Sequence, residues 1–380
     1  MLAGIIPQLA ALVALLSHPG ASFSLPLQRR FGRNPTAVAI SSVAETDRSS
    51  ALDWSFLDGV YLITCPNADP GGERLEKATG ILNEVGLLDL VEIKSFDTDD
   101  EDRIRGCYTS HISVYKDILA TISKQTTIFN DFFGSLTNQP DSDIEKDMNV
   151  LILEDNLALS SGEVQQSVID SIVQYTTENP TWDMVHLSYI PYVPDLKVTK
   201  TDQKDIVKLS CGVGSALGTT AYIINVKAIK RLLQEDKEQG GFYLPIPDLM
   251  AKLFPESRYA TNPTMFVRAP NTKSLVNPQL DDLRALLFQP SVAVLIQSVL
   301  ASTGLTTNAL LPIVIASLLL CSGLSISSSL ASLNELLTTG TIDGPIIVPV
   351  LSSLFSVLTL LIIAQGAILA PKQAPSPEDG

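Results

Sequence analysis

Strand-like and helix-like segments alternate between Asp53 and Leu287, and this alternation constrains the fold more than any other feature of the chain. The pattern predicts an α/β domain with an open sheet and helices on its faces. Buried strands are expected at "GVYLITC" (59–65) and "NVLILE" (149–154), an amphipathic helix at "GERLEKATGILNEVGLL" (72–88), and a strand that turns into a helix near Val226 in "TTAYIINVKAIKRLLQE" (219–235).

Charge, cysteines and histidines exclude several classes of function. The net charge of -15 argues against nucleic acid as a partner, because binding a phosphate backbone takes clustered lysine and arginine. The four cysteines show no CxxC spacing, so neither a zinc ribbon nor a disulfide framework can be read from them. Only three histidines are present, which argues against a histidine-rich metal centre.

The two ends of the chain differ from the middle in composition. Residues 1–28 carry no charged side chain and include an apolar run typical of a signal peptide or targeting segment. Residues 29–52 are then a stem or a transit-like linker. Near the other end, three apolar and almost chargeless stretches predict two or three transmembrane helices within 288–370, followed by a polar tail at 371–380. These ends predict a membrane protein that faces the lumen of the endoplasmic reticulum or Golgi, with a plastid membrane as the alternative.

An acidic pair and an asparagine directly follow the second buried strand. Glu154, Asp155 and Asn156 therefore stand where an α/β sheet places its ligands, at the carboxyl end of a strand. Oxygen ligands at this position suit Mg²⁺ or Mn²⁺, and such an ion would neutralise a diphosphate. An ordinary helix N-cap is the alternative interpretation of the same three residues.

Several segments, taken in order between Gly59 and Val276, resemble glycosyltransferase family 25, which includes lipooligosaccharide and procollagen galactosyltransferases. The ordered set is far more specific than any one segment. The matching segments are "GVYLITC" with "ERLEKATGIL", "RGCYTSHISVYKDIL", "VLILEDN", "WDMVHLSY", "GTTAYIINVKAIKRLL", and "LPIPDLM" with "PTMFVRAPNTKSLV".

The resemblance implies a GT-A-like domain at 53–287 that moves a hexose, galactose first of all, from a UDP-sugar to a hydroxyl acceptor with inversion. The acceptor would be a glycan, a lipid-linked sugar or a protein hydroxyl, and Mn²⁺ or Mg²⁺ would assist. Asp155 would be the metal ligand, supported by Glu154. Asn156 stands where the family usually has a second aspartate, so the alternative is a catalytically inactive domain that binds a glycan or nucleotide sugar.

The resemblance also assigns the general base. Asp248 in "PIPDLM" is the first candidate and Asp183 is the second, although Asp183 could instead fix a loop at the end of a strand. A carboxylate is needed there because it must accept the proton of the attacking hydroxyl.

Substrate-binding residues follow from the same comparison. Ser110 and His111 fall on the family's Ser-His pair at a helix start, where free backbone N–H groups can bind phosphate. Thr219 and Tyr222 would shape the sugar or acceptor pocket. The alternatives are a half-buried capping role for His111 and plain strand packing for Tyr222, and His186 is expected in the core.

Overall fold

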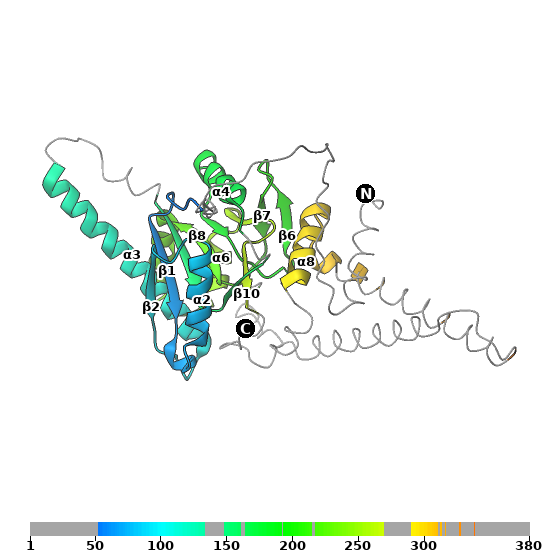
Figure 1. Ribbon diagram of the computed structural model, residues 1–380, viewed down its shortest axis with the longest axis horizontal. Coiled ribbons are helices and arrows are strands. Elements are labelled where there is room, and N and C mark those ends of the chain that lie inside the picture. The colour runs from blue at the N-terminus through cyan, green and yellow to red at the C-terminus, as the bar shows by residue number, and fades with distance from the viewer. Residues whose placement is uncertain are drawn as a thin grey trace, which may run out of the picture. The chain divides into compact units, whose positions relative to one another are not determined.

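An eight-stranded mixed sheet forms the centre of the computed structural model, which describes residues 52–133, 148–160, 164–191, 193–214, 217–269 and 290–310 and a few single positions beyond. Figure 1 shows the sheet with helices beside it. The strand order is β2-β1-β3-β8-β5-β9-β7-β6. The strands are β1 (Gly59–Thr64), β2 (Val91–Ser95), β3 (Asn149–Glu154), β5 (Met184–His186), β6 (Lys197–Lys200), β7 (Ile206–Ser210), β8 (Ala221–Asn225) and β9 (Arg258–Thr261). A separate two-stranded sheet pairs β4 (Leu157–Leu159) with β10 (Phe266–Arg268).

Helices cover both faces of the large sheet, as the sequence pattern predicts. They are α2 (Glu73–Glu84), α3 (Arg103–Phe133), α4 (Gln166–Glu178), α5 (Val226–Glu238), α6 (Ile246–Leu253) and α8 (Pro290–Thr303), with a short 3-10 helix, η1 (Pro66–Ala68). One apolar cluster joins α2 and α4 to side chains such as Leu62 and Leu153. A second cluster joins α3, α5 and α6 to Ile63 and Ile152 on the opposite face. Alternate residues of a strand point to opposite faces, so both central strands are buried on each side.

The direction of the strands marks the end of the sheet at which α/β folds of this kind bind ligands. Strand β1 pairs in parallel with β2 on one side and with β3 on the other. The order in which the chain adds strands to the sheet therefore changes side between β1 and β3. Connections that leave in opposite directions open a crevice at the carboxyl ends of two such strands. Strand β8 lies antiparallel between β3 and β5, so its first residues lie beside the carboxyl end of β3.

The expectation of a C-terminal transmembrane helical region is wrong for the part that the structure describes. Within the described residues, no helix is long and apolar enough to cross a membrane. Helix α8, which covers the first of the three apolar stretches, has 14 residues and packs beside β6. Its Leu300 and Ala301 are buried in a third cluster with Val198 and Leu209, and Gln297 is fully buried. The apolar character of α8 is thus explained by packing against the sheet.

The remaining predictions about the chain ends fall mostly beyond the described part. Residues 1–51, with the targeting segment and nearly all of the linker, lie outside it. So do all of 345–370, nearly all of 311–344 and the polar tail.

Candidate functional site at the ends of β1 and β3

The acidic pair after β3 divides between the two sides of the sheet. Glu154 continues the strand's alternation and points to the α3 side, where His111 meets it. Asp155 follows it and points to the α2 side, where Arg74 forms an ion pair with its Oδ1. The two carboxylates belong to two separate clusters of side chains, which adjoin at the carboxyl end of β3.

Glu154 is held by three donors from different parts of the chain. His111 Nε2 lies 3.3 Å from its Oε1, the Thr219 hydroxyl donates to the same oxygen, and Asn156 Nδ2 donates to Oε2 over 3.0 Å. Burial alone would raise the pKa of Glu154, but the hydrogen bonds from His111, Thr219 and Asn156 outweigh it and lower the pKa. Glu154 is therefore a firmly ionised carboxylate with 18% of its side chain exposed.

A buried chain of hydroxyls lies behind His111 and sets its orientation. His111 Nδ1 is 2.8 Å from the Tyr222 hydroxyl, which in turn contacts the Tyr115 hydroxyl. With Nε2–H donating to Glu154, Nδ1 accepts from Tyr222, and Tyr222 accepts from Tyr115, so every group has a partner. Cys107, His111 and Tyr115 follow one another at intervals of four residues along α3, which places them on one face of the helix.

Asp155 forms the second cluster, with the end of β1 and the first turn of α2. Thr64, the last residue of β1, donates its hydroxyl to Asp155 Oδ2 over 2.8 Å, while the Arg74 guanidinium binds Oδ1. The Asp69 side chain accepts from the Arg74 backbone N–H over 2.7 Å and so caps the start of α2. Burial raises the pKa of Asp155 although Arg74 opposes the shift. The carboxylate is 4% exposed, so its charge depends on this pairing.

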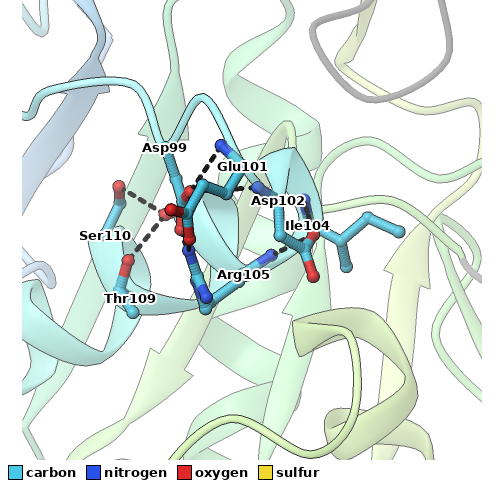
Figure 2. A network of polar contacts seen from close by, with 8 residues as sticks. Asp99, Glu101, Asp102, Ile104, Arg105, Thr109 and Ser110 are labelled. Atoms are coloured by element: carbon cyan, nitrogen blue, oxygen red, sulfur yellow. Dashed lines mark hydrogen bonds and ion pairs between the residues drawn. The ribbon is translucent and has the colours of Figure 1, made fainter.

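A network before α3 fixes where that helix begins (Figure 2). Asp99 accepts from the backbone N–H groups of Glu101 and Asp102 and from the Arg105 guanidinium. Asp102 in turn accepts from the N–H groups of Ile104 and Arg105, which are unpaired donors at a helix start. These contacts hold the first turn of α3, the helix that carries Cys107 and His111.

The other residues predicted for the site have different surroundings. Ser110 is buried, and its hydroxyl donates to the Gly106 carbonyl over 2.9 Å, so the hydroxyl is engaged within α3 (Figure 2). Asp183 precedes β5 and so lies at the opposite ends of the strands from Glu154, where Arg231 and Ser257 donate to its Oδ2. The structure brings Glu154, Asp155, Asn156, His111, Thr219 and Tyr222 together and leaves Asp183 apart from them.

Asp248 lies in the first turn of α6 and is 8% exposed. Its Oδ1 accepts from the Gly214 backbone N–H over 2.8 Å, and burial raises its pKa above the usual value. Helix α6 packs on the same face of the sheet as α3. Among the described residues, no hydrogen bond or ion pair connects Asp248 to the cluster around Glu154.

The arrangement of donors does not fit Mn²⁺ or Mg²⁺. Those ions take about six oxygen ligands, whereas all four carboxylate oxygens of Glu154 and Asp155 already accept from this chain's own side chains. Arg74 is the cation that pairs with Asp155. Among the buried side-chain oxygens of Glu154, Asp155 and Asn156, only Asn156 Oδ1 has no partner in the described part of the chain.

Another set of ligand atoms lies close by. Those of Cys107, His111 and Glu154 lie within 4.8 Å of one another. Sulfur and nitrogen donors favour softer ions than Mn²⁺ or Mg²⁺. Burial raises the pKa of the Cys107 thiol far above its usual value, so the group is a neutral thiol.

Sequence reasoning missed four residues of the site, Arg74, Thr64, Cys107 and Tyr115. A signal for Arg74 was present, because a helix that follows a parallel strand begins at the carboxyl edge of the sheet. Cys107 and Tyr115 could have been found from their four-residue spacing around His111. Thr64 carried no signal, since a threonine that ends a buried strand is ordinary.

Comparison with known proteins adds no relative at this point. No family model matches the chain, and no curated protein matches it.

Proposed function

We propose that the domain transfers a hexosyl group from a nucleotide sugar to a hydroxyl acceptor with inversion. One observation carries the proposal. Four segments that resemble glycosyltransferase family 25, far apart in the sequence, supply interacting side chains at the carboxyl ends of β1 and β3: Arg74, His111, the pair Glu154 and Asp155, and Thr219 with Tyr222. A chance resemblance of short segments gives no reason for their side chains to meet.

The position of these residues in the sheet supports the same function. The site lies at the carboxyl ends of the parallel strands β1 and β3, where the connection from β1 leads to β2 on one side and β3 lies on the other. Open α/β sheets bind nucleotides at such points. Three donors from different segments hold the ionised Glu154 in place. Tyr222 and Tyr115 keep His111 in one orientation behind it.

The reaction needs one base and one leaving group. The acceptor oxygen forms a bond to the anomeric carbon while the bond from that carbon to the diphosphate oxygen breaks, and a carboxylate takes the acceptor's proton. Asp248 has the better properties for this base, because burial raises its pKa and its Oδ2 makes no hydrogen bond within the described residues. Asp183 is less suitable, because Arg231 and Ser257 both donate to its Oδ2 and it lies at the opposite ends of the strands.

A matched pair of variants tests the proposal on the full-length protein. Release of UDP from UDP-galactose and UDP-glucose would be measured with and without sugar acceptors. Asp248→Asn keeps an oxygen for the Gly214 N–H and should still bind UDP while losing transfer by about a hundredfold or more. Asp183→Asn should retain transfer.

Two outcomes would contradict the proposal. If the wild-type chain binds neither UDP nor a UDP-sugar, the nucleotide-sugar assignment is wrong. If it binds a UDP-sugar but releases no UDP with any acceptor, the chain is a binding domain and not a transferase.

A further inference from the structure

Two arginines near the end of β1 carry buried donors without a partner. Arg74 comes from the first turn of α2 and Arg103 from the first turn of α3. Arg74 Nε and Arg103 Nη1 are both buried and make no hydrogen bond within the described residues. Buried donors in folded proteins almost always have acceptors. Two such donors beside one strand end indicate an acceptor that the described part of the chain does not supply.

Arg103 stands four residues before Cys107 on one face of α3, and the ligand atoms of Cys107 and Glu154 lie within 4.8 Å of each other. Arg103 therefore comes one helical turn from the acidic pair, where Arg74 already binds Asp155. The charges that act on Cys65, the residue after β1, agree with this placement. Burial raises the pKa of the Cys65 thiol, and so do the charges of Asp155 and Glu154. The charges of Arg74 and Arg103 both act on the same thiol in the opposite direction.

Neither arginine is fully used by its carboxylate partner. Arg74 binds Asp155 through Nη2, which leaves Nε free to donate. Arg103 Nη2 lies 3.0 Å from Asp100 Oδ1, but the Asp100 side chain is 82% exposed, so solvent screens that pair. A guanidinium has five N–H donors in a planar fork, which lets it hold a carboxylate and a phosphate oxygen at once.

We propose that Arg74 and Arg103 bind the diphosphate of the nucleotide donor directly, and that Arg74 takes the place of a divalent cation beside Asp155. The proposal rests on the proposed function for the identity of the ligand. Arginine suits the task because its hydrogen bonds to phosphate are charge-assisted and directional. A metal ion at Asp155 would have to displace Arg74 and would leave the guanidinium without its buried counter-ion.

The test measures binding of UDP and of inorganic pyrophosphate to the full-length chain by titration calorimetry, once in EDTA and once in Mn²⁺. The Kd for UDP should be the same within about twofold in both buffers. Arg74→Gln should weaken binding about tenfold or more, because a charged hydrogen-bond donor is lost. Lys77→Gln is the matched control, since it removes the same charge from the same helix at a residue whose ion-pair partner in the described part of the chain is the exposed Glu73.

Asp155→Asn separates the two interpretations even if Arg74→Gln fails to fold. A metal ligand cannot be replaced by an amide without loss of affinity, so a metal-dependent site would lose UDP in Mn²⁺. In the arginine site the same change removes a negative charge next to the phosphates, and binding should hold or strengthen. Thermal melts of each variant would establish that it is folded.

The outcomes distinguish failure of this inference from failure of the proposed function. Binding of UDP only in Mn²⁺ overturns the inference and leaves the transferase proposal standing. Pyrophosphate binding that depends on Arg74, without any binding of UDP, supports the anion site and refutes the nucleotide-sugar assignment. If neither probe binds, both the inference and the proposed function are overturned. If Arg74→Gln and Lys77→Gln weaken binding equally, the role of Arg74 is overturned.

Discussion

Replacing Gly106 with alanine would test whether close packing at the start of α3 positions the site. A Cβ at this position would lie 2.8 Å from Asp99 Cβ and 3.3 Å from the Asp99 backbone nitrogen. Asp99 cannot easily move away, because its carboxylate holds two backbone N–H groups and the Arg105 guanidinium (Figure 2). The extra methyl group therefore has to push α3 or the preceding turn out of place.

The size of the effect follows from two opposing contributions. Alanine is better than glycine in a helix by about 1 kcal/mol, while overpacking a tight contact costs about 1 to 3 kcal/mol. The net change for Gly106→Ala is then a loss of stability of up to about 2 kcal/mol. Gly80, in α2, is the matched control, since a Cβ there would meet no atom within 4 Å. Gly80→Ala should gain about 1 kcal/mol.

The assay compares urea unfolding of the two variants by circular dichroism. The two free energies of unfolding should differ by about 1 to 3 kcal/mol in favour of Gly80→Ala. In a domain of this size each kcal/mol corresponds to about 2 to 4 °C in Tm. UDP binding should weaken only in Gly106→Ala, because Cys107 and His111 move with the start of α3. If Gly106→Ala is as stabilising as Gly80→Ala, the contact with Asp99 is not tight and the reasoning is refuted.

Three further results are expected. Tyr222→Phe leaves His111 Nδ1 without its buried partner and should lower the free energy of unfolding by about 1 to 3 kcal/mol in urea titrations; unchanged stability would mean that the hydroxyl network does not form. Asp183→Asn removes the carboxylate charge that pairs with Arg231 and should lower Tm while UDP binding stays the same, and a loss of binding in the folded variant would place Asp183 in the site. Burial and the charge of Arg258 lower the pKa of His186 from 6.5 to about 3, so the unfolded chain takes up its proton first as the pH falls. Wild-type stability should therefore decline between these two pH values by about 1 kcal/mol per unit relative to His186→Leu, and parallel pH profiles would contradict this.

Local sequence pattern predicted the central elements closely. The buried runs at 59–65 and 149–154 are β1 and β3, and the expected change from strand to helix near Val226 is the junction of β8 and α5. These predictions succeed because fully apolar strands and amphipathic helices are specified by residues next to one another in the chain. The C-terminal prediction failed at α8 because an apolar helix reads the same whether lipid or a sheet covers it, and hydropathy does not identify the partner.

The sequence by itself therefore determined the α/β class, the buried strands and the position of an acidic pair at a strand end. Tertiary structure alone decided what each acid meets. Glu154 and Asp155 are neighbours in sequence, yet the alternation at the end of β3 sends one to His111 on α3 and the other to Arg74 on α2. The partners lie 43 and 81 residues away, so only the packing of both helices against the sheet brings them into contact. That packing also explains why an aspartate that resembles a metal ligand in the sequence is paired with an arginine in the fold.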